Sequence, residues 1–298
     1  MTAVSPRFLI RFWGARGSCP SPGPSTLRYG GNTSCIEVRS GDGAVIVLDA
    51  GTGIRALGNA LHREATPSTT HLFLTHRHAD HVIGLPHFLP LFARDRRIVM
   101  RCGNADAIGI RHTTSVLLSP PLFPALDGLA SFLDIAEFDA NGSAAVSAQV
   151  NVRMLSARHP GGAAIFVVSD AAGAVLAFSP DNELAYGSSD FDIGEWRSEL
   201  ARSLQGIPIL VHDAMYRDEE ITRHVGWGHS SAEEATRFAM ECNAGALVLF
   251  HHHPERDDVA IDDIEEACRA MVSRAGSSMR VEAAYEGLEI SVTVDSRQ

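Results

Sequence analysis

The chain of 298 residues contains no lysine: all 25 of its basic residues are arginines, and 36 acidic residues outnumber them. Mechanisms that depend on a lysine, such as a P-loop or a Schiff base, are therefore excluded. The formal net charge of −11 also argues against a broad surface that follows the phosphates of a long nucleic acid. Long nucleic acid is therefore an unexpected partner.

Paired cysteines and long apolar runs are absent too. The five cysteines are widely spaced and form no C-x-x-C pair, which fits neither a disulfide framework nor a zinc ribbon. The first residues do not have the pattern of a signal peptide, and no apolar run approaches the length of a membrane span. We therefore expect a cytoplasmic protein with no membrane partner.

Hydrophobic residues make up 45% of the chain, which is enough for a sizeable core. No change of composition marks a domain boundary, so we expect a single domain over residues 1–298. Short apolar runs and interspersed helical patterns favour an α/β sandwich. The expected strands are Phe8–Trp13, Cys35–Val38, Val45–Leu48, His71–Leu74, Ile98–Arg101, Val150–Leu155, Ile165–Ser169, Val175–Phe178, Ile207–Val211, Leu247–Phe250 and Val281–Ala284.

Three segments carry helical patterns. Ile54–His62 has apolar residues three to four positions apart. The segment Ser231–Cys242 begins with the capping-box pair Ser231 and Glu234. Asp257–Arg274 has an acidic first turn and arginines near its end, as the helix dipole favours. We expect helices at these three places.

Histidines are the abundant feature, and most of the 14 fall in a few clusters. The strongest cluster is T-H-R-H-A-D-H at Thr75–His81, directly after an apolar strand. The alternative is a solvated polar loop in which the histidines occur by chance. We favour a metal site, because buried imidazoles that lie close together repel one another unless they bind metal or are paired. Imidazole and carboxylate together suit Zn, Mn or Fe. The candidate ligands here are His76, His78, Asp80 and His81.

The pattern H-x-H-x-D-H resembles the signature of the metallo-β-lactamase superfamily, and other motifs of that superfamily match in the same order. Asp49, after the strand Val45–Leu48, resembles the aspartate that supports the histidine loop without binding metal. His159, Asp181 and His251 resemble the later ligands. The resemblance implies a four-layer αββα sandwich with its site at the edge between the two sheets.

The resemblance also implies two divalent ions, with zinc expected and Mn or Fe accepted by the same residue types. Two such ions about 3.5–4 Å apart can hold a bridging hydroxide as the nucleophile and stabilise charge on a phosphoryl or acyl oxygen. Asp80 is expected to act both as a ligand and in catalysis. The implied ligands are His76, His78 and His159 for the first ion, Asp80, His81 and His251 for the second, and Asp181 between them.

His251 has two histidine neighbours, so the register of the last ligand is open by one residue. We prefer His251 because it directly follows the strand Leu247–Phe250. Alternation along an extended chain would turn His252 away from the same point.

Two further segments resemble the tRNase Z-like phosphodiesterase branch. Asp213 ends one strand, and His229 lies just before the helix Ser231–Cys242. In that branch the acidic residue orients the histidine, which protonates the leaving oxygen. The alternative is that His229 only precedes a serine-capped helix.

The N-terminal loops resemble phosphodiesterases that open ribose cyclic phosphates and relatives that cleave cyclic nucleotides. Arg16, Arg28 and Asn32 are the candidate phosphate or ribose contacts. Ordinary polar loop residues are the equally good alternative.

The tRNase Z enzymes of bacteria typically carry a basic arm between the third and fourth motifs. Here Asp181 follows His159 by 22 positions, which two strands and a turn fill. The sequence therefore favours a small phosphodiester as substrate. The alternatives are hydrolysis of a thioester or lactone, cleavage of tRNA 3′ ends, and a non-catalytic ligand-binding module. The resemblance also implies a homodimer, and the Pro-rich segment near Leu117–Leu133 is a candidate interface or lid, although self-burial is the simpler explanation.

Overall fold

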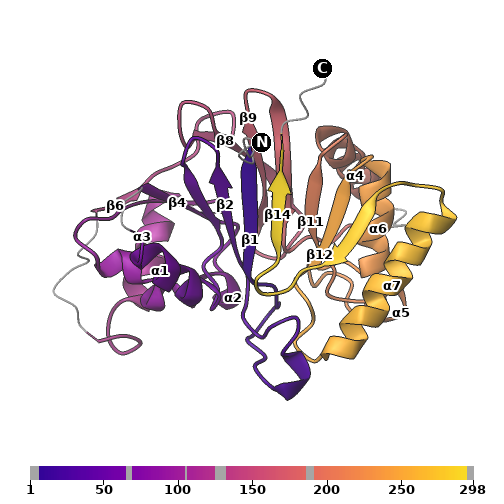
Figure 1. Ribbon diagram of the computed structural model, residues 1–298, viewed down its shortest axis with the longest axis horizontal. Helices are drawn as coiled ribbons and strands as arrows, with labels where there is room; N and C mark the ends of the chain where they lie inside the picture. The colour runs from indigo at the N-terminus through magenta and orange to yellow at the C-terminus, as the bar shows by residue number, and fades with distance from the viewer. Residues whose placement is uncertain (1–6, 65–68, 105, 125–131, 186–190, 294–298) are drawn as a thin grey trace, which may run out of the picture.

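The computed structural model describes residues 7–64, 69–104, 106–124, 132–185 and 191–293. Two seven-stranded sheets face each other, and helices cover the outer face of each one (Figure 1). This is the four-layer αββα sandwich that the family resemblance implies. No helix in the described part of the chain is long and apolar enough to cross a membrane.

The first sheet is built mostly from the N-terminal half. Neighbouring strands of this sheet are antiparallel from Glu289–Val292 through to Val45–Leu48, and they are parallel from Val45–Leu48 onward. In spatial order its strands are β14 (Glu289–Val292), β1 (Phe8–Gly14), β2 (Cys35–Ser40), β3 (Val45–Leu48), β4 (Thr69–Leu74), β5 (Arg97–Cys102) and β6 (Phe132–Ile135).

The second sheet repeats this plan with the later part of the chain. Its strands are antiparallel up to β10 and parallel from β10 onward. In spatial order they are β13 (Arg280–Ala283), β12 (Ala246–Phe250), β11 (Ile209–Asp213), β10 (Gly173–Ser179), β9 (Ala163–Asp170), β8 (Asn151–Ala157) and β7 (Ser143–Ala145).

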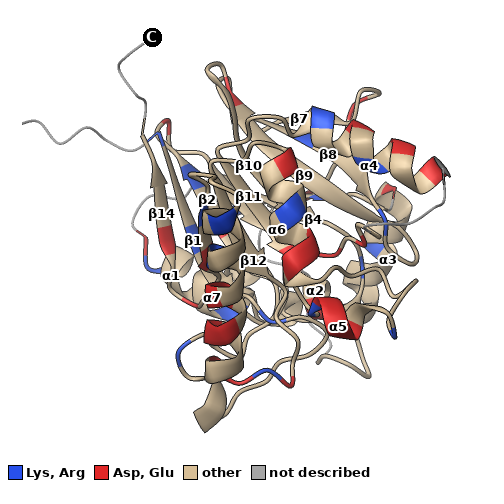
Figure 2. Ribbon diagram, turned by 90° about the vertical axis from the view of Figure 1, so that its right-hand side faces the viewer, with Lys and Arg blue, Asp and Glu red and all other residues tan. Residues whose placement is uncertain are grey.

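Helices lie on both outer faces (Figure 1). Those beside the first sheet are α1 (Ile54–His62), the one-turn α2 (Ala79–Val82) and α3 (Ala107–Leu117), with short 3-10 turns at Pro24–Thr26, Leu85–His87 and Leu89–Phe92. Those beside the second sheet are α4 (Phe191–Ser203), α5 (Asp218–Ile221), α6 (Ala232–Glu241) and α7 (Asp258–Arg274). Acidic residues are prominent on α5 and α7, where the net negative charge of the chain reaches the surface (Figure 2).

All eleven expected strands and all three expected helices are present, with ends shifted by a few residues at most. Ser231 caps α6 as predicted: its hydroxyl accepts from the amide of Glu234, and the Glu234 carboxylate accepts from the amide of Ser231. The sequence patterns did not predict β6, β7, β14, α3 and α4, or the four-residue helices α2 and α5. The missed strands are only three or four residues long, and α3 and α4 have weakly amphipathic patterns, so local periodicity had little to detect.

The Pro-rich segment follows α3 and is described up to residue 124. Phe123 packs on Phe92 and on His87, which supports self-burial, whereas Leu122 is exposed. The remainder of that segment, residues 125–131, lies outside the described residues. Its use as an interface or lid stays a prediction.

Aromatic side chains join the two sheets at their inner faces. Phe166 on β9 is fully buried, and its ring centroid lies 5.6 Å from that of Phe73 on β4 and 5.8 Å from that of Phe138. These contacts pack the two sheets against each other, and they therefore fix how the strand ends of one sheet lie relative to those of the other.

We expect Phe166→Ala to lower the free energy of unfolding by about 3–5 kcal/mol, because it leaves a cavity between the sheets. Denaturant unfolding followed by circular dichroism measures this change. The control is Phe132→Ala on β6, where the ring is 71% exposed and the expected change is within about 0.5 kcal/mol. Equal losses in the two variants would contradict this account of the core.

Candidate metal centre

The carboxyl ends of the parallel strands of both sheets converge at one edge of the sandwich. Open α/β sheets place their ligand sites at such edges. The side chains that meet there come from the segments after β3, β4, β8, β10, β11 and β12, and they include every ligand that the sequence predicts. They are Asp49, His76, His78, Asp80, His81, His159, Asp181, Asp213, His229 and His251.

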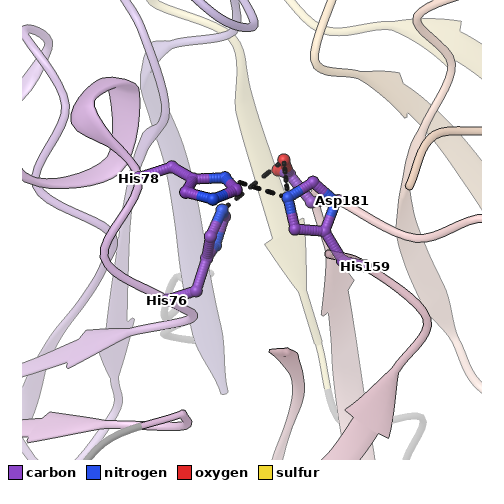
Figure 3. Close-up of side chains that lie close together, drawn as sticks. All are labelled: His76, His78, His159 and Asp181. Carbon is purple, nitrogen blue, oxygen red and sulfur yellow. Dashed lines mark hydrogen bonds and ion pairs between the residues drawn. The ribbon is translucent and has the colours of Figure 1, made fainter. Parts of the chain in front are cut away.

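The first group of candidate ligands contains His76, His78, His159 and Asp181. One ligand atom from each lies within 4.8 Å of the others, and the four side chains point toward one another from two sides (Figure 3). The Nε2 of His159 is 3.0 Å from the Nδ1 of His78. Asp181 Oδ2 lies 3.7 Å from the Nε2 of His76 and 3.6 Å from the Nε2 of His159.

The second group contains Asp80, His81 and His251, again with ligand atoms within 4.8 Å. The Oδ2 of Asp80 lies 3.2 Å from the Nε2 of His81 and 3.0 Å from the Nε2 of His251. Asp181 reaches this group with its other oxygen: Oδ1 is 3.0 Å from the Nε2 of His81 and 3.2 Å from the Nε2 of His251. One carboxylate thus faces both groups.

Unpaired polar atoms at the centre of the cluster fit a divalent cation. The Nε2 atoms of His76 and His81 and the Oδ1 of Asp181 are buried and make no hydrogen bond of good geometry, although His81 and Asp181 lie at ion-pair distance. Burial without a partner is costly for such groups. Imidazole nitrogens and carboxylate oxygens are ligands of zinc and similar metals, so these residues suit the predicted ions.

Burial and neighbouring charges shift the pKa values of several candidate ligands. Burial, and next the neighbouring His81, lowers the pKa of His76 to about 2, which keeps this ring in the neutral form that binds metal. Burial opposes ionisation of Asp181, but the imidazoles of His251, His81 and His76 outweigh it and hold its pKa well below the usual range. At His81 burial opposes the charged form, but Asp80, Asp181 and Asp49 outweigh it and hold the pKa well above the usual value, so a bound cation would have to displace a proton from this ring.

Asp49 supports the histidine loop from behind, as the resemblance implies. It is fully buried, and its Oδ2 is 2.7 Å from the Nδ1 of His81. The same carboxylate accepts from the amide and hydroxyl of Thr75 and from the hydroxyl of Ser34. These contacts fix the ring of His81 with its Nε2 toward the cluster.

Backbone strain accompanies two of these residues. Asp49 has φ 63° and His251 has φ 61°, a left-handed conformation that few non-glycine residues adopt. At His251 this turn aims the ring into the cluster, while the Nε2 of His252 lies 2.8 Å from the carbonyl oxygen of Ala284. His251 is therefore the residue brought to the centre, through a local turn rather than through simple strand alternation.

Asp213 and His229 lie against the cluster. The Oδ2 of Asp213 is 2.6 Å from the Nδ1 of His229, and the His229 ring centroid is 5.3 Å from that of His159 and 5.1 Å from that of His251. Burial opposes the charged form of His229, but Asp213, then Asp181 and Asp80, outweigh it and raise its pKa to about 9. His229 therefore lies against the cluster as well as directly before the capped helix, and its role as general acid stays a prediction.

The structure gives Arg16 contacts within the protein. Its side chain is 1% exposed, and the guanidinium donates to the carbonyl oxygens of Gly30, His253 and Arg256. Arg16 therefore ties loops together through Nε and Nη1, while its buried Nη2 makes no hydrogen bond, and its substrate contact stays a prediction. A single arginine in a loop sequence does not show whether its donors are taken up by backbone carbonyls.

Arg28 and Asn32 are also paired within the protein. Arg28 forms an ion pair with Asp262 on α7, and the Nδ2 of Asn32 donates to Glu286. Their substrate contacts stay predictions.

Three supporting contacts were not predicted from the sequence. The amide of Ser18 donates to Asp80 Oδ2 at 2.7 Å, and a Cβ on Gly17 would lie 2.4 Å from the ring of His251. The buried Glu183 accepts from two loop amides beside His159. The nearness of Glu183 to Asp181 in sequence was the one available signal for it.

Comparison with known proteins agrees with this geometry. Residues 45–252 match the family model of the β-lactamase superfamily domain. The chain belongs to this superfamily. The superfamily predicted from the histidine motif is thereby confirmed.

Two curated relatives cover most of the chain. A protein of Mycobacterium tuberculosis described as uncharacterised, Rv1339, is 29% identical over 219 residues that cover 72% of this chain and 72% of that protein. A ribonuclease Z of Haloarcula marismortui is 23% identical over an alignment 319 positions long, which covers 92% of this chain and 96% of the enzyme.

Solved structures with this fold include unliganded yeast PDE1, with a TM-score of 0.71 at 13% identity over 97% of this chain and all of that chain. Zinc-bound PqqB of Methylobacterium extorquens has a TM-score of 0.67 at 16% identity over 95% and 100%. A diphosphatase of the PhnP family has 0.63 at 14% over 95% and 97%. The chain is a metallo-β-lactamase-fold hydrolase related to ribonuclease Z.

We expect the purified protein to bind two divalent ions per chain and to lose thermal stability when a chelator removes them, because buried imidazoles and carboxylates then lose their common partner. Elemental analysis and thermal melting with and without chelator measure both effects. Restoring Zn, Mn or Fe separately shows which ion returns the melting temperature. Fewer than one ion per chain together with an unchanged melting temperature would contradict the assignment.

Proposed function

We propose that this protein hydrolyses a small phosphodiester, such as a cyclic nucleotide or a ribose cyclic phosphate, at a dinuclear metal centre, with His229 as the general acid. The observation that carries the proposal is the 2.6 Å contact between Asp213 and His229 directly beside the ligand rings. An alkoxide or ribose oxygen leaves poorly and needs a general acid, and a histidine held by a carboxylate at that place would supply the proton.

The proposed metal ligands are His76, His78 and His159 on one side, Asp80, His81 and His251 on the other, and Asp181 between them. Divalent ions held there would supply an activated water and neutralise negative charge on the phosphoryl oxygens. The protein's own part is to hold both oxygens of Asp181 toward opposite groups and to keep Asp49 behind His81.

His229 has one ring nitrogen for orientation and one for chemistry. Its Nδ1 is taken by Asp213, which in turn accepts from the amides of Met215 at 3.0 Å and Asn182 at 3.3 Å. This leaves Nε2 as the nitrogen that carries a proton to the leaving oxygen. Asp213 keeps the ring oriented and favours its protonated form.

The opening of the site favours a small substrate. Among the first-group residues His78 is exposed, whereas the side chains of His76 and His159 are buried, so substrate would enter on the side of His78. The segment from His159 to Asp181 is occupied by the hairpin of β9 and β10, and no arm protrudes there. Long RNA would lack that grip.

We expect the metal-loaded protein to hydrolyse cyclic nucleotides, ribose cyclic phosphates or short linear diesters, and to leave lactones and thioesters intact. Steady-state rates over a panel of these substrates, with a tRNA 3′ precursor included, measure this selectivity. Hydrolysis of the lactone or thioester alone would replace the proposal with acyl transfer chemistry. Cleavage of the tRNA precursor alone would make the protein an endonuclease.

We expect His229→Ala to retain its metal and lower turnover of a diester with an alkoxide leaving group by roughly 10²–10⁴-fold, because the proton donor is lost. A diester with p-nitrophenolate as leaving group should lose much less, since that group departs without a proton. The matched control is His112→Ala, an exposed histidine on α3. Wild-type turnover of the alkoxide substrate by His229→Ala would sink the assignment.

A further inference from the structure

Glu183 is a buried carboxylate that neither the metal centre nor the proton transfer uses. The residue is only 5% exposed, and no arginine or histidine forms an ion pair with its carboxylate in the described ranges. Instead, the carboxylate accepts from backbone amides: both oxygens lie 3.0 Å from the nitrogen of Gly226, and Oε2 lies 2.9 Å from that of Gly228. A buried charge held only by amides suggests a specific task for this residue.

The amides that bind Glu183 come from a loop of unusual conformation. Gly226 has φ 83° and Gly228 has φ 86°, both in the left-handed region that favours glycine. Such a conformation lets nearby N–H groups face one anion, as in the concave anion sites known as nests. Here the anion is the side chain of Glu183, so the protein itself fills the nest.

The same loop touches a metal ligand on its other side. The Nδ1 of His159 lies 2.9 Å from the carbonyl oxygen of Gly228, and a Cβ on Gly228 would lie 2.2 Å from that nitrogen. Gly228 is therefore fitted between the carboxylate of Glu183 and the ring of His159. A ring that donates through Nδ1 presents Nε2 to the metal, and it keeps that tautomer only while the carbonyl stays in place.

The next residue along the chain is His229. Because consecutive Cα atoms are only about 3.8 Å apart, a shift of Gly228 moves the backbone of His229 as well. The Glu183 side chain thus acts on the first metal group and on the general acid through one glycine.

We propose that Glu183 is a positioning residue: by holding the amides of Gly226 and Gly228, it sets the carbonyl that orients His159 and the backbone that carries His229. The half of this inference that concerns His229 rests on the proposed function, and the half that concerns His159 does not. A carboxylate suits the task because both of its oxygens accept, and charge-assisted hydrogen bonds are roughly twice as strong as neutral ones. A glutamine offers one accepting oxygen and an amino group that repels the amide donors.

The test compares Glu183→Gln and Glu183→Ala with the wild type and with Glu265→Gln. Glu265, on α7, is a matched control because its carboxylate also accepts a backbone amide, that of Ala283, away from the metal cluster. Three quantities are measured for each protein: zinc affinity by competition with a chelator, thermal melting, and turnover at saturating zinc of one diester with an alkoxide leaving group and one with p-nitrophenolate.

We expect Glu183→Gln to bind zinc about 10–100-fold more weakly, as when other outer partners of a metal-binding histidine are lost, and Glu183→Ala to be weaker still. At saturating zinc both variants should lose more turnover on the alkoxide diester than on the p-nitrophenolate diester. A graded loss with a nearly unchanged melting temperature separates positioning from folding. Glu265→Gln should keep wild-type zinc affinity and the wild-type ratio of the two rates.

Wild-type zinc affinity and an unchanged ratio of rates in both Glu183 variants would overturn the inference. A drop in melting temperature with no selective loss in either quantity would also overturn it, because it would assign Glu183 to folding alone. His229→Ala tells the two proposals apart. If the turnover of that variant does not depend on the leaving group, the proposed function fails. The zinc affinity of the Glu183 variants then still tests whether Glu183 positions His159.

Discussion

The carboxylate of Asp181 is the group on which the rest of the centre depends. Its two oxygens face opposite ways, one toward His76 and His159 and the other toward His81 and His251. Without it, two sets of buried imidazoles would face each other with no shared counter-charge. One side chain is therefore shared by both groups of candidate ligands, which come from the loops of the two sheets.

The fold meets this requirement by joining two similar halves. Each sheet changes from antiparallel to parallel pairing, at β3 and at β10, and the strands that follow deliver their carboxyl ends to the same edge. Buried contacts such as that between Phe73 and Phe166 hold the halves together behind the cluster. Around the ligands lies a layer of fixed groups, Asp49 behind His81 and Asp213 behind His229, with Glu183 and Gly228 beside His159.

Local sequence patterns were sufficient to predict features that are formed by residues close together in the chain. The segment Thr75–His81 shows its purpose through composition alone, and the capping box at Ser231 shows where α6 begins. Arg16 shows the limit of such reasoning. Its exposure depends on carbonyls of residues far along the chain, Arg256 among them, which no local pattern reveals.

The sequence by itself indicated the superfamily through its strand-end motifs, which are local properties of the chain, and the αββα fold and the candidate ligands followed from that resemblance; apolar periodicity alone predicted only an α/β sandwich. Only the tertiary structure showed which of His251 and His252 faces the cluster. It also showed that Arg16 donates to backbone carbonyls and that Glu183 accepts from amides of the loop before His229. Each of these depends on backbone turns and on contacts between residues distant in sequence, and such contacts exist only after the two sheets have packed.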